Sequence, residues 1–134
     1  MGIYEDIMAY RPCCEQEERD REVMLDYIRR NDDAFLRTNL VAHMTASGWV
    51  VNPARDKVLM AYHKIYDSWS WTGGHADGET DLLHVAMREA KEETGIEHLR
   101  LIGGGVISLE ILPVWAHVKR GRAVGSHLHL NVSY

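Results

Sequence analysis

The sequence is poor in cysteine and in long apolar runs. Its only cysteines among 134 residues are Cys13 and Cys14. Neighbouring cysteines rarely close a bridge, so we expect reduced thiols and no disulfide framework. No apolar run approaches the roughly 20 residues that span a bilayer, and the N-terminus lacks the basic start and apolar stretch of a signal peptide. These absences predict a soluble cytoplasmic protein with no membrane partner.

Positive charge is also in short supply. The chain has 15 lysines and arginines against 20 aspartates and glutamates, a net charge of −5. Proteins that bind nucleic-acid polymers need a basic surface to displace counterions, so we exclude such a partner. A small phosphorylated molecule stays open as a substrate if a divalent cation bridges its phosphates to protein carboxylates.

Hydrophobic spacing predicts an N-terminal helix ahead of a single mixed domain. Residues 14–31 are acidic at the front and basic at the back, which suits the helix dipole, and the helix is expected to end near Asn31. We therefore assign 1–38 to an N-terminal helical extension and 39–134 to the main domain. A chain of this length can bury a proper core without disulfides.

The main domain is predicted to be α+β, with strands before and after one central helix. The helix covers 81–94, with Thr80 as its N-cap and Gly95 as its C-cap. Trp69 and Trp71 are expected on one face of a short strand before a glycine pair. The other predicted strands are 43–52 and 57–65, joined as a hairpin, then 99–102, 106–118 and 127–134.

Three glutamates of the predicted helix fall on one side of it. Glu89, Glu92 and Glu93 are related by i, i+3 and i, i+4, so they project within an arc of about 100°. Such like-charge pairs destabilise an isolated helix by roughly 0.2–0.5 kcal/mol each. Taken alone, this glutamate spacing is also typical of a solvent-exposed acidic face of a helix. The position of the cluster beside the apolar side of the helix favours a bound cation, and carboxylate ligands suit Mg²⁺ or Mn²⁺.

The segment 73–96, GGHADGETDLLHVAMREAKEETGI, resembles the signature of the Nudix hydrolases. That signature ends in R-E-U-x-E-E-x-G-U, where U is a bulky aliphatic residue, and Arg88 to Ile96 match every fixed position. Gly74 lies at the expected distance upstream. One departure is visible: the usual glutamate position holds Thr80, so Glu79 must shift by one place or the partner of Arg88 is lost.

This resemblance implies an α/β/α sandwich with a mixed sheet and cleavage of a diphosphate linked to another moiety, typically a nucleoside. The cofactor would be Mg²⁺ or Mn²⁺. Glu92 or Glu89 would help to deprotonate the attacking water, and Arg88 would orient a carboxylate. The implied metal ligands are Glu89, Glu92, Glu93 and the Gly74 carbonyl.

Aromatic and imidazole side chains suggest where a substrate is contacted. His127 and His129 alternate along one predicted strand and therefore share a sheet face. Ordinary sheet packing, substrate contact and metal binding all stay open for them, although no further metal ligand is evident. The pattern resembles a Nudix subgroup with GGHADG before the helix and H-L-H-L on a later strand. The predicted substrate-binding residues are Trp71, His75, His127 and His129.

The resemblance also predicts that something is missing after the last strand. Nudix domains normally continue with another strand and a helix, whereas this sequence stops at Tyr134 inside a predicted strand. We therefore expect a truncated C-terminal part and a last strand with an exposed edge or apolar face. The N-terminal helices or a second chain, as in a homodimer, are alternatives that would cover it.

Two other functions share the fold. A non-catalytic Nudix-fold binding or regulatory module has no need of the repulsive glutamate cluster. An isopentenyl-diphosphate isomerase-like enzyme would need a cysteine near the sheet, whereas Cys13 and Cys14 lie in the N-terminal extension. The sequence does not identify one substrate, because fold alone does not fix it.

Overall fold

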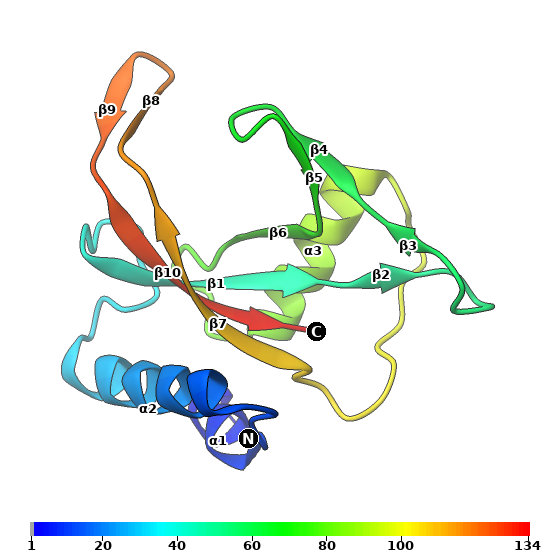
Figure 1. The fold of residues 1–134 in the computed structure, drawn as a ribbon, viewed down its shortest axis with the longest axis horizontal. Coiled ribbons are helices and arrows are strands. Elements are labelled where there is room, and N and C mark those ends of the chain that lie inside the picture. Colours follow the sequence, from blue (N-terminus) through cyan, green and yellow to red (C-terminus); the bar gives the residue numbers. More distant parts are fainter. Residues whose placement is uncertain (1) are drawn as a thin grey trace.

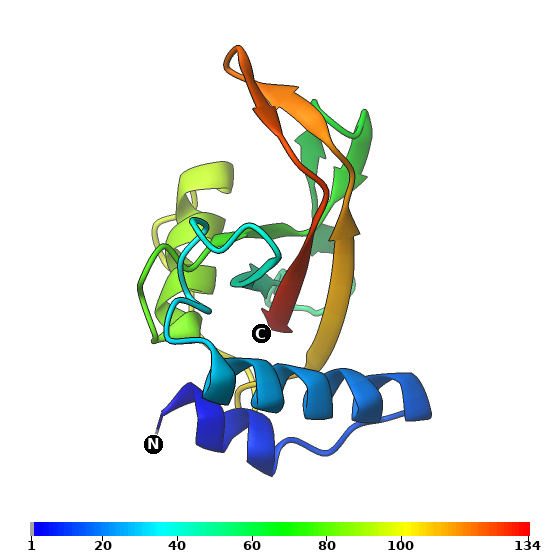
Figure 2. The same cartoon turned by 90° about the vertical axis from the view of Figure 1, so that its left-hand side faces the viewer.

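The computed structural model describes residues 2–134 and places three helices against a mixed sheet of four strands (Figures 1 and 2). The predicted α+β fold is confirmed. The helices are α1 (Ile3–Ala9), α2 (Glu15–Arg30) and α3 (Leu82–Thr94). The strands are β1 (Ala42–Gly48), β2 (Val50–Val51), β3 (Val58–Leu59), β4 (Ala61–His63), β5 (Ser68–Ser70), β6 (Thr72–His75), β7 (Ser108–Val114), β8 (His117–Lys119), β9 (Arg122–Val124) and β10 (His127–Ser133).

The main sheet has the strand order β6-β1-β10-β7. β1 and β10 are parallel, and the other two pairings are antiparallel. The last strand, β10, therefore lies inside the sheet, hydrogen-bonded to β1 on one side and to β7 on the other. The expectation that β10 would present an exposed edge is wrong, because β7 pairs with β10 along the full length of β10, from His127 to Ser133.

Alternation along β1 and β10 gives the sheet two chemically different faces. Met44 and Leu130 belong to the hydrophobic core, together with Leu82 and Val85 of α3. The intervening side chains, which include His43 and the residues after it at every second position, point to the opposite face. That polar face carries His43, Thr45, Ser47, His127, His129, Asn131 and Ser133.

The N-terminal helices pack on the same core. Ile3 and Ile7 of α1 and Met24 of α2 are buried in it, and Figure 2 shows both helices below the sheet. Helix α2 matches the predicted segment within a residue at each end, whereas α1 was not predicted. No helix described between residues 2 and 134 is long and apolar enough to cross a membrane.

Two hairpins extend beyond the main sheet. The pairs β4–β5 and β8–β9 rise on the two sides of the polar face (Figure 1). The predicted hairpin between 43–52 and 57–65 is confirmed only where Val50 and Val51 pair with Leu59 and Val58. Before Trp49, β1 pairs with β6 and β10 instead. Trp49 donates its backbone N–H to the Tyr134 carbonyl, at the point where β1 ends and β2 begins.

The predicted strand at 99–102 is wrong. The segment is irregular, it leads into the glycines 103–105, and Leu101 and Ile102 expose 37% and 40% of their surface. Apolar residues without a sheet edge to pair with do not form a strand. The predicted strand at 106–118 exists as two strands, β7 and β8, separated at Trp115–Ala116.

Candidate active site

Helix α3 is positioned by its two caps and by one buried side. The Asp81 carboxylate accepts a hydrogen bond from the backbone N–H of His84, so Asp81 rather than the predicted Thr80 is the N-cap. Gly95 ends the helix in the left-handed conformation with φ 75°, as predicted. Its buried residues pack against β1 and β6 and fix which side faces the cleft: Leu82, Val85, Ala86 and Ala90.

The glycine pair of β6 allows α3 to approach closely. A Cβ at Gly74 would lie 2.4 Å from the Glu89 Cδ, and one at Gly73 would lie 2.7 Å from the Ser47 Oγ. Real Cβ atoms do not approach so near: at Gly73 a Cβ would also meet the Ala46 carbonyl oxygen at 2.8 Å, and at Gly74 it would force the Glu89 side chain to move. The backbone N–H of Gly73 donates to Glu93 at 3.3 Å. The glycine pair therefore brings two carboxylates of α3 against the backbone of a sheet strand.

We call Glu89, Glu92 and Glu93 the carboxylate edge. Glu89 is half-buried and lines the cleft, whereas Glu92 is exposed at the surface of α3. The carboxylate oxygens of these three glutamates do not all lie within 4.8 Å of one another. Burial raises the pKa of Glu93, and the negative charges of Glu89 and Glu92 add to this. A cation among them would relieve that repulsion.

The shifted glutamate spacing has a visible consequence. Glu79 accepts from the backbone N–H of Asp81 and faces His84 at 3.5 Å, so it does not reach Arg88. Arg88 instead contacts Glu89 at 3.3 Å and the His75 carbonyl at 3.5 Å. The usual partner of the arginine is therefore replaced, and Arg88 holds the carboxylate beside it.

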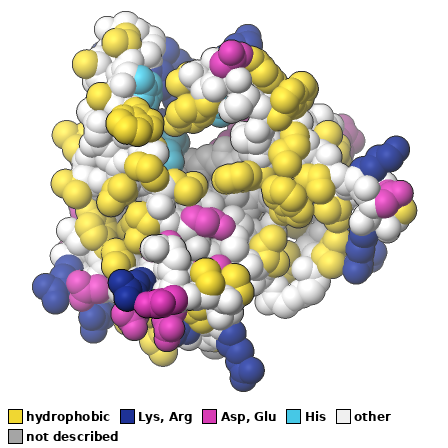
Figure 3. Space-filling model, viewed as in Figure 1, with side chains coloured by type: hydrophobic (Ala, Val, Ile, Leu, Met, Phe, Trp, Pro, Cys, Tyr) yellow, Lys and Arg dark blue, Asp and Glu magenta, His cyan; other side chains and the backbone are white. Residues whose placement is uncertain are grey.

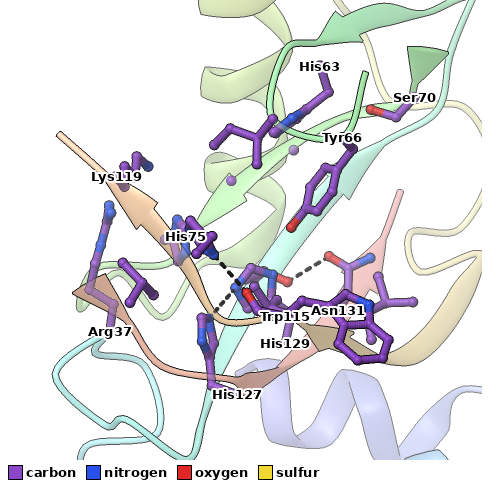
Figure 4. Close-up of a pocket in the computed structure, with 18 of the residues that line it drawn as sticks. Arg37, His63, Tyr66, Ser70, His75, Trp115, Lys119, His127, His129 and Asn131 are labelled. Atoms are coloured by element: carbon purple, nitrogen blue, oxygen red, sulfur yellow. Dashed lines mark hydrogen bonds between the residues drawn. The ribbon is translucent and has the colours of Figure 1, made fainter. Parts of the chain in front are cut away.

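A cleft of about 1210 Å³ lies between the two hairpins and the polar face of the sheet (Figures 3 and 4). Glu89 and Gly74 line it at one side, and Tyr66, Trp71 and Trp115 supply aromatic surface. Basic side chains at its rim are Arg37, Lys119, Arg120 and Arg122. Three of these residues come from the β8–β9 hairpin, and only the fold shows that this hairpin borders the cleft.

The two tryptophans predicted together are separated. Trp71 lines the cleft, and its indole N–H donates to the Ser47 hydroxyl at 3.0 Å. Trp69 exposes 69% of its surface and packs edge-on against Tyr62, away from the cleft-lining residues. Neither Cys13 nor Cys14 lines the cleft, and both thiols are exposed.

Four histidines gather on the polar face; we call His43, His75, His127 and His129 the histidine face. In Figure 4 the labelled rings of His75, His127 and His129 converge within the cleft. The ring centroid of His43 lies 5.2 Å from that of His75, 4.9 Å from that of His127 and 5.1 Å from that of His129. The predicted shared face of His127 and His129 is confirmed, with their Nε2 atoms 3.2 Å apart.

Sequence reasoning missed His43. This residue lies on β1 directly beside His129 of β10, because the two strands are parallel and in register. Only 4% of it is exposed, and its Nδ1 lies 3.0 Å from the Asn39 carbonyl. Among residues 2–134 its buried Nε2 has no hydrogen-bond partner, which costs about 1–3 kcal/mol if nothing else binds there.

Three members of the histidine face, His43, His75 and His129, have lowered pKa values. Burial lowers the pKa of His75 to about 4, with the positive charge of Arg37 as the next cause. Burial also lowers the pKa of His129 to about 3, and the neighbouring histidines add to this. The pKa of His43 is lowered for the same first reason. These imidazoles are therefore free bases at neutral pH, the form that accepts hydrogen bonds and binds metals.

A hydrogen-bond network fixes the polar face next to the histidines. Asn131 is 2% exposed, and its carbonyl oxygen accepts from Thr45 at 2.8 Å and Ser47 at 3.0 Å. Its amide donates to Glu110 at 2.9 Å, and Glu110 also accepts from Ser108 and Ser133. Because the network is satisfied on both sides of Asn131, it makes a rigid floor for the cleft.

A sheet strand with a glycine pair, a loop and a helix edged with carboxylates define the class of protein to which the chain is compared. Comparison with family models identifies the class. The NUDIX domain model matches residues 42–124, so the chain belongs to the Nudix hydrolase superfamily. A search of curated proteins gives no match.

Proposed function

We propose that this protein is a metal-dependent Nudix hydrolase that cleaves a diphosphate linkage in a nucleoside diphosphate derivative or a related small molecule. The observation that carries the proposal is the contact of Glu89 with Gly74. A side chain at Gly74 would displace this carboxylate, so the glycine places the Glu89 carboxylate against the backbone of β6. The family membership supports hydrolysis in general, and the substrate class is inferred from the residues that line the cleft.

The carboxylate edge fits the divalent cation that Nudix enzymes generally use. Its side chains offer hard oxygen donors, which suit Mg²⁺ or Mn²⁺. Burial is the main cause of the raised pKa of Glu93, and the negative charges of Glu89 and Glu92 on the same side of α3 raise it further. We assign Glu89, Glu92, Glu93 and the Gly74 carbonyl as the groups that hold the ion.

The remaining residues bind, orient and accept a proton. The bound cation supplies charge neutralisation of the diphosphate and a lowered pKa of a bound water. Glu92 or Glu89 accepts the proton that the attacking water loses, and Arg88 fixes the direction of Glu89 through its 3.3 Å contact. Catalysis by a positioned carboxylate base is worth about 10²–10⁴-fold in rate.

The cleft gives the substrate its other contacts. Trp71 is held by Ser47 and offers an aromatic surface to a base or sugar. His75, His127 and His129 line the same cleft and are assigned to substrate contact. The basic rim attracts an anion to an acidic protein, since local charge decides encounter more than net charge does.

Hydrolysis of a substrate panel tests the proposal. Nucleoside diphosphate sugars, dinucleoside polyphosphates and nucleoside triphosphates are each incubated with and without Mg²⁺. We expect turnover of at least one class only with Mg²⁺, and a loss of about 10²–10⁴-fold in Glu92→Gln. Glu97→Gln, an exposed glutamate just beyond α3, is the matched control and keeps wild-type turnover.

The outcomes separate the alternatives. Metal-independent turnover, or turnover unchanged in both Glu92→Gln and Glu89→Gln, would contradict the assignment of the carboxylate edge. Binding of a panel member without release of any product would favour the non-catalytic module instead.

A further inference from the structure

We propose that His43, His75 and His129 form a second metal site, for a divalent transition metal of the Zn²⁺ type, with an open coordination position facing the cleft. This goes beyond the proposed hydrolysis, because it concerns a different set of ligands and a different class of metal.

His43 is oriented as metal-binding histidines are. Its Nδ1 lies 3.0 Å from the Asn39 carbonyl, so Nδ1–H donates there and the Nε2 lone pair is left free. That Nε2 is buried and unpartnered among residues 2–134. A buried acceptor aimed at other acceptors is unfavourable unless a proton donor or a cation lies between them.

Three strands bring the other ligands to it. His43 comes from β1, His75 from β6 and His129 from β10, and one ligand nitrogen from each lies within 4.8 Å of the others. Zinc binds imidazole nitrogen at about 2.0–2.1 Å with tetrahedral geometry, so the nitrogens must close somewhat further. His75 and His129 are only half-buried and can rotate, whereas His43 is fixed by Asn39.

The composition of the site selects the metal. All three ligands are neutral imidazoles, which suit zinc, copper, nickel and cobalt, whereas Mg²⁺ prefers oxygen donors. Arg37 also lines the cleft, and its pairing with Asp77 at 2.5 Å offsets part of its positive charge. The carboxylate edge and the histidine face therefore divide two classes of cation between them.

His127 flanks this site. Its Nδ1 lies 2.8 Å from the Gly125 carbonyl, and its Nε2 lies 3.2 Å from the Nε2 of His129. His127 is outside the group whose ligand atoms converge. We therefore expect it to tune the site rather than to complete it. The fourth position faces the cleft that His75 and His129 line, where a water or an oxygen of the substrate binds.

Equilibrium dialysis of the tag-free, chelator-stripped chain against Zn²⁺ in the presence of excess Mg²⁺ tests the site. We expect one Zn²⁺ per chain. His75→Gln and His129→Gln weaken binding by at least about 10- to 100-fold, and His127→Gln weakens it less. His98→Gln, at an exposed position, is the matched control and binds as the wild type does.

Three further variants and readouts keep the result unambiguous. His43→Gln is included with a thermal unfolding curve, because the residue is buried; the two half-buried variants test the site even if His43→Gln fails to fold. Glu89→Gln keeps full zinc binding, so a failure of hydrolysis is distinguished from a failure of this site. Bound Co²⁺ should show the visible absorption of a tetrahedral nitrogen site in the wild type.

Two results would overturn the inference. One is that the wild-type chain retains no Zn²⁺. The other is that His75→Gln and His129→Gln retain as much as His98→Gln, since the binding then comes from elsewhere on the protein.

Discussion

The carboxylate edge and the histidine face both adjoin β6, yet they differ in chemistry, and only Glu89 of the carboxylate edge lines the cleft. The carboxylate edge is acidic and belongs to one helix, so its geometry follows from local spacing. The histidine face consists of imidazoles from three strands and depends on the register between β1 and β10. The carboxylate edge is therefore encoded locally in the sequence, whereas the histidine face depends on the fold.

Gly74→Ala is expected to have the largest effect, because it disturbs the carboxylate edge. Its Cβ would lie 2.4 Å from the Glu89 Cδ, so Glu89 or β6 must move. A displacement of this size at a catalytic group costs about 10²-fold in turnover. The measurement is kcat/KM for the best panel substrate.

Gly104→Ala is the matched control for that experiment. A Cβ at Gly104 meets nothing within 4 Å, so its turnover should equal that of the wild type. Full activity of Gly74→Ala would mean that the contact with Glu89 has no part in the reaction.

Asn131→Ala tests whether the floor of the histidine face is rigid. The change leaves Thr45, Ser47 and Glu110 without their shared partner in a buried setting. We expect a loss of about 1–3 kcal/mol in the free energy of unfolding, measured by denaturant titration. Thr38→Ala, at an exposed position, is the control; an equal, small effect of both changes would show that the network is not stabilising.

In the chelator-stripped protein, acidification should lower the stability of the fold through the histidines with lowered pKa values. The unfolded histidines take up protons below about pH 6.5, whereas His75 and His129 in the fold resist protonation until about pH 4 and about pH 3. Their contribution to stability is therefore complete above pH 6.5 and is lost progressively as the pH falls below it.

The readout is the denaturation midpoint at pH 7 and pH 5. We expect the midpoint of the wild type to fall, and that of His129→Gln to fall less because one depressed pKa is removed. His98→Gln should show the wild-type dependence. Identical pH dependence of His129→Gln and the wild type would contradict the lowered pKa of His129.

Arg37→Gln is expected to have the smallest effect on stability. The Arg37–Asp77 pair is about half exposed on both sides, and such pairs contribute about 0–1 kcal/mol to stability. We expect little change in the denaturation midpoint, and zinc binding at least as tight as in the wild type, because the substitution removes a positive charge that lowers the pKa of His75 and leaves the Asp77 carboxylate without its partner. A large loss of stability would show that the pair does more than neutralise the rim.

What the sequence predicts correctly here is local. The helix that carries Glu89, Glu92 and Glu93, its C-cap Gly95 and the shared face of His127 and His129 all follow from spacings within one element. The N-cap was misplaced by one residue, because Thr80 and Asp81 are both good caps and sequence alone does not choose between them.

What the sequence does not predict depends on pairing between distant segments. His43 lies beside His129 only because β1 and β10 pair in parallel, and the two histidines are 86 positions apart in the sequence. The central position of β10 has the same origin, since nothing in residues 127–133 reveals that β7 and β1 flank it. The rim at 119–122 likewise borders the cleft through the path of a hairpin.

The most direct test of this account is a paired measurement on Glu89→Gln and His129→Gln, with Mg²⁺-dependent hydrolysis and zinc content determined on the same preparations. The account predicts that Glu89→Gln loses hydrolysis by about 10²–10⁴-fold and keeps its zinc, whereas His129→Gln loses its zinc. Wild-type hydrolysis by Glu89→Gln would contradict the central claim that the carboxylate edge carries the reaction.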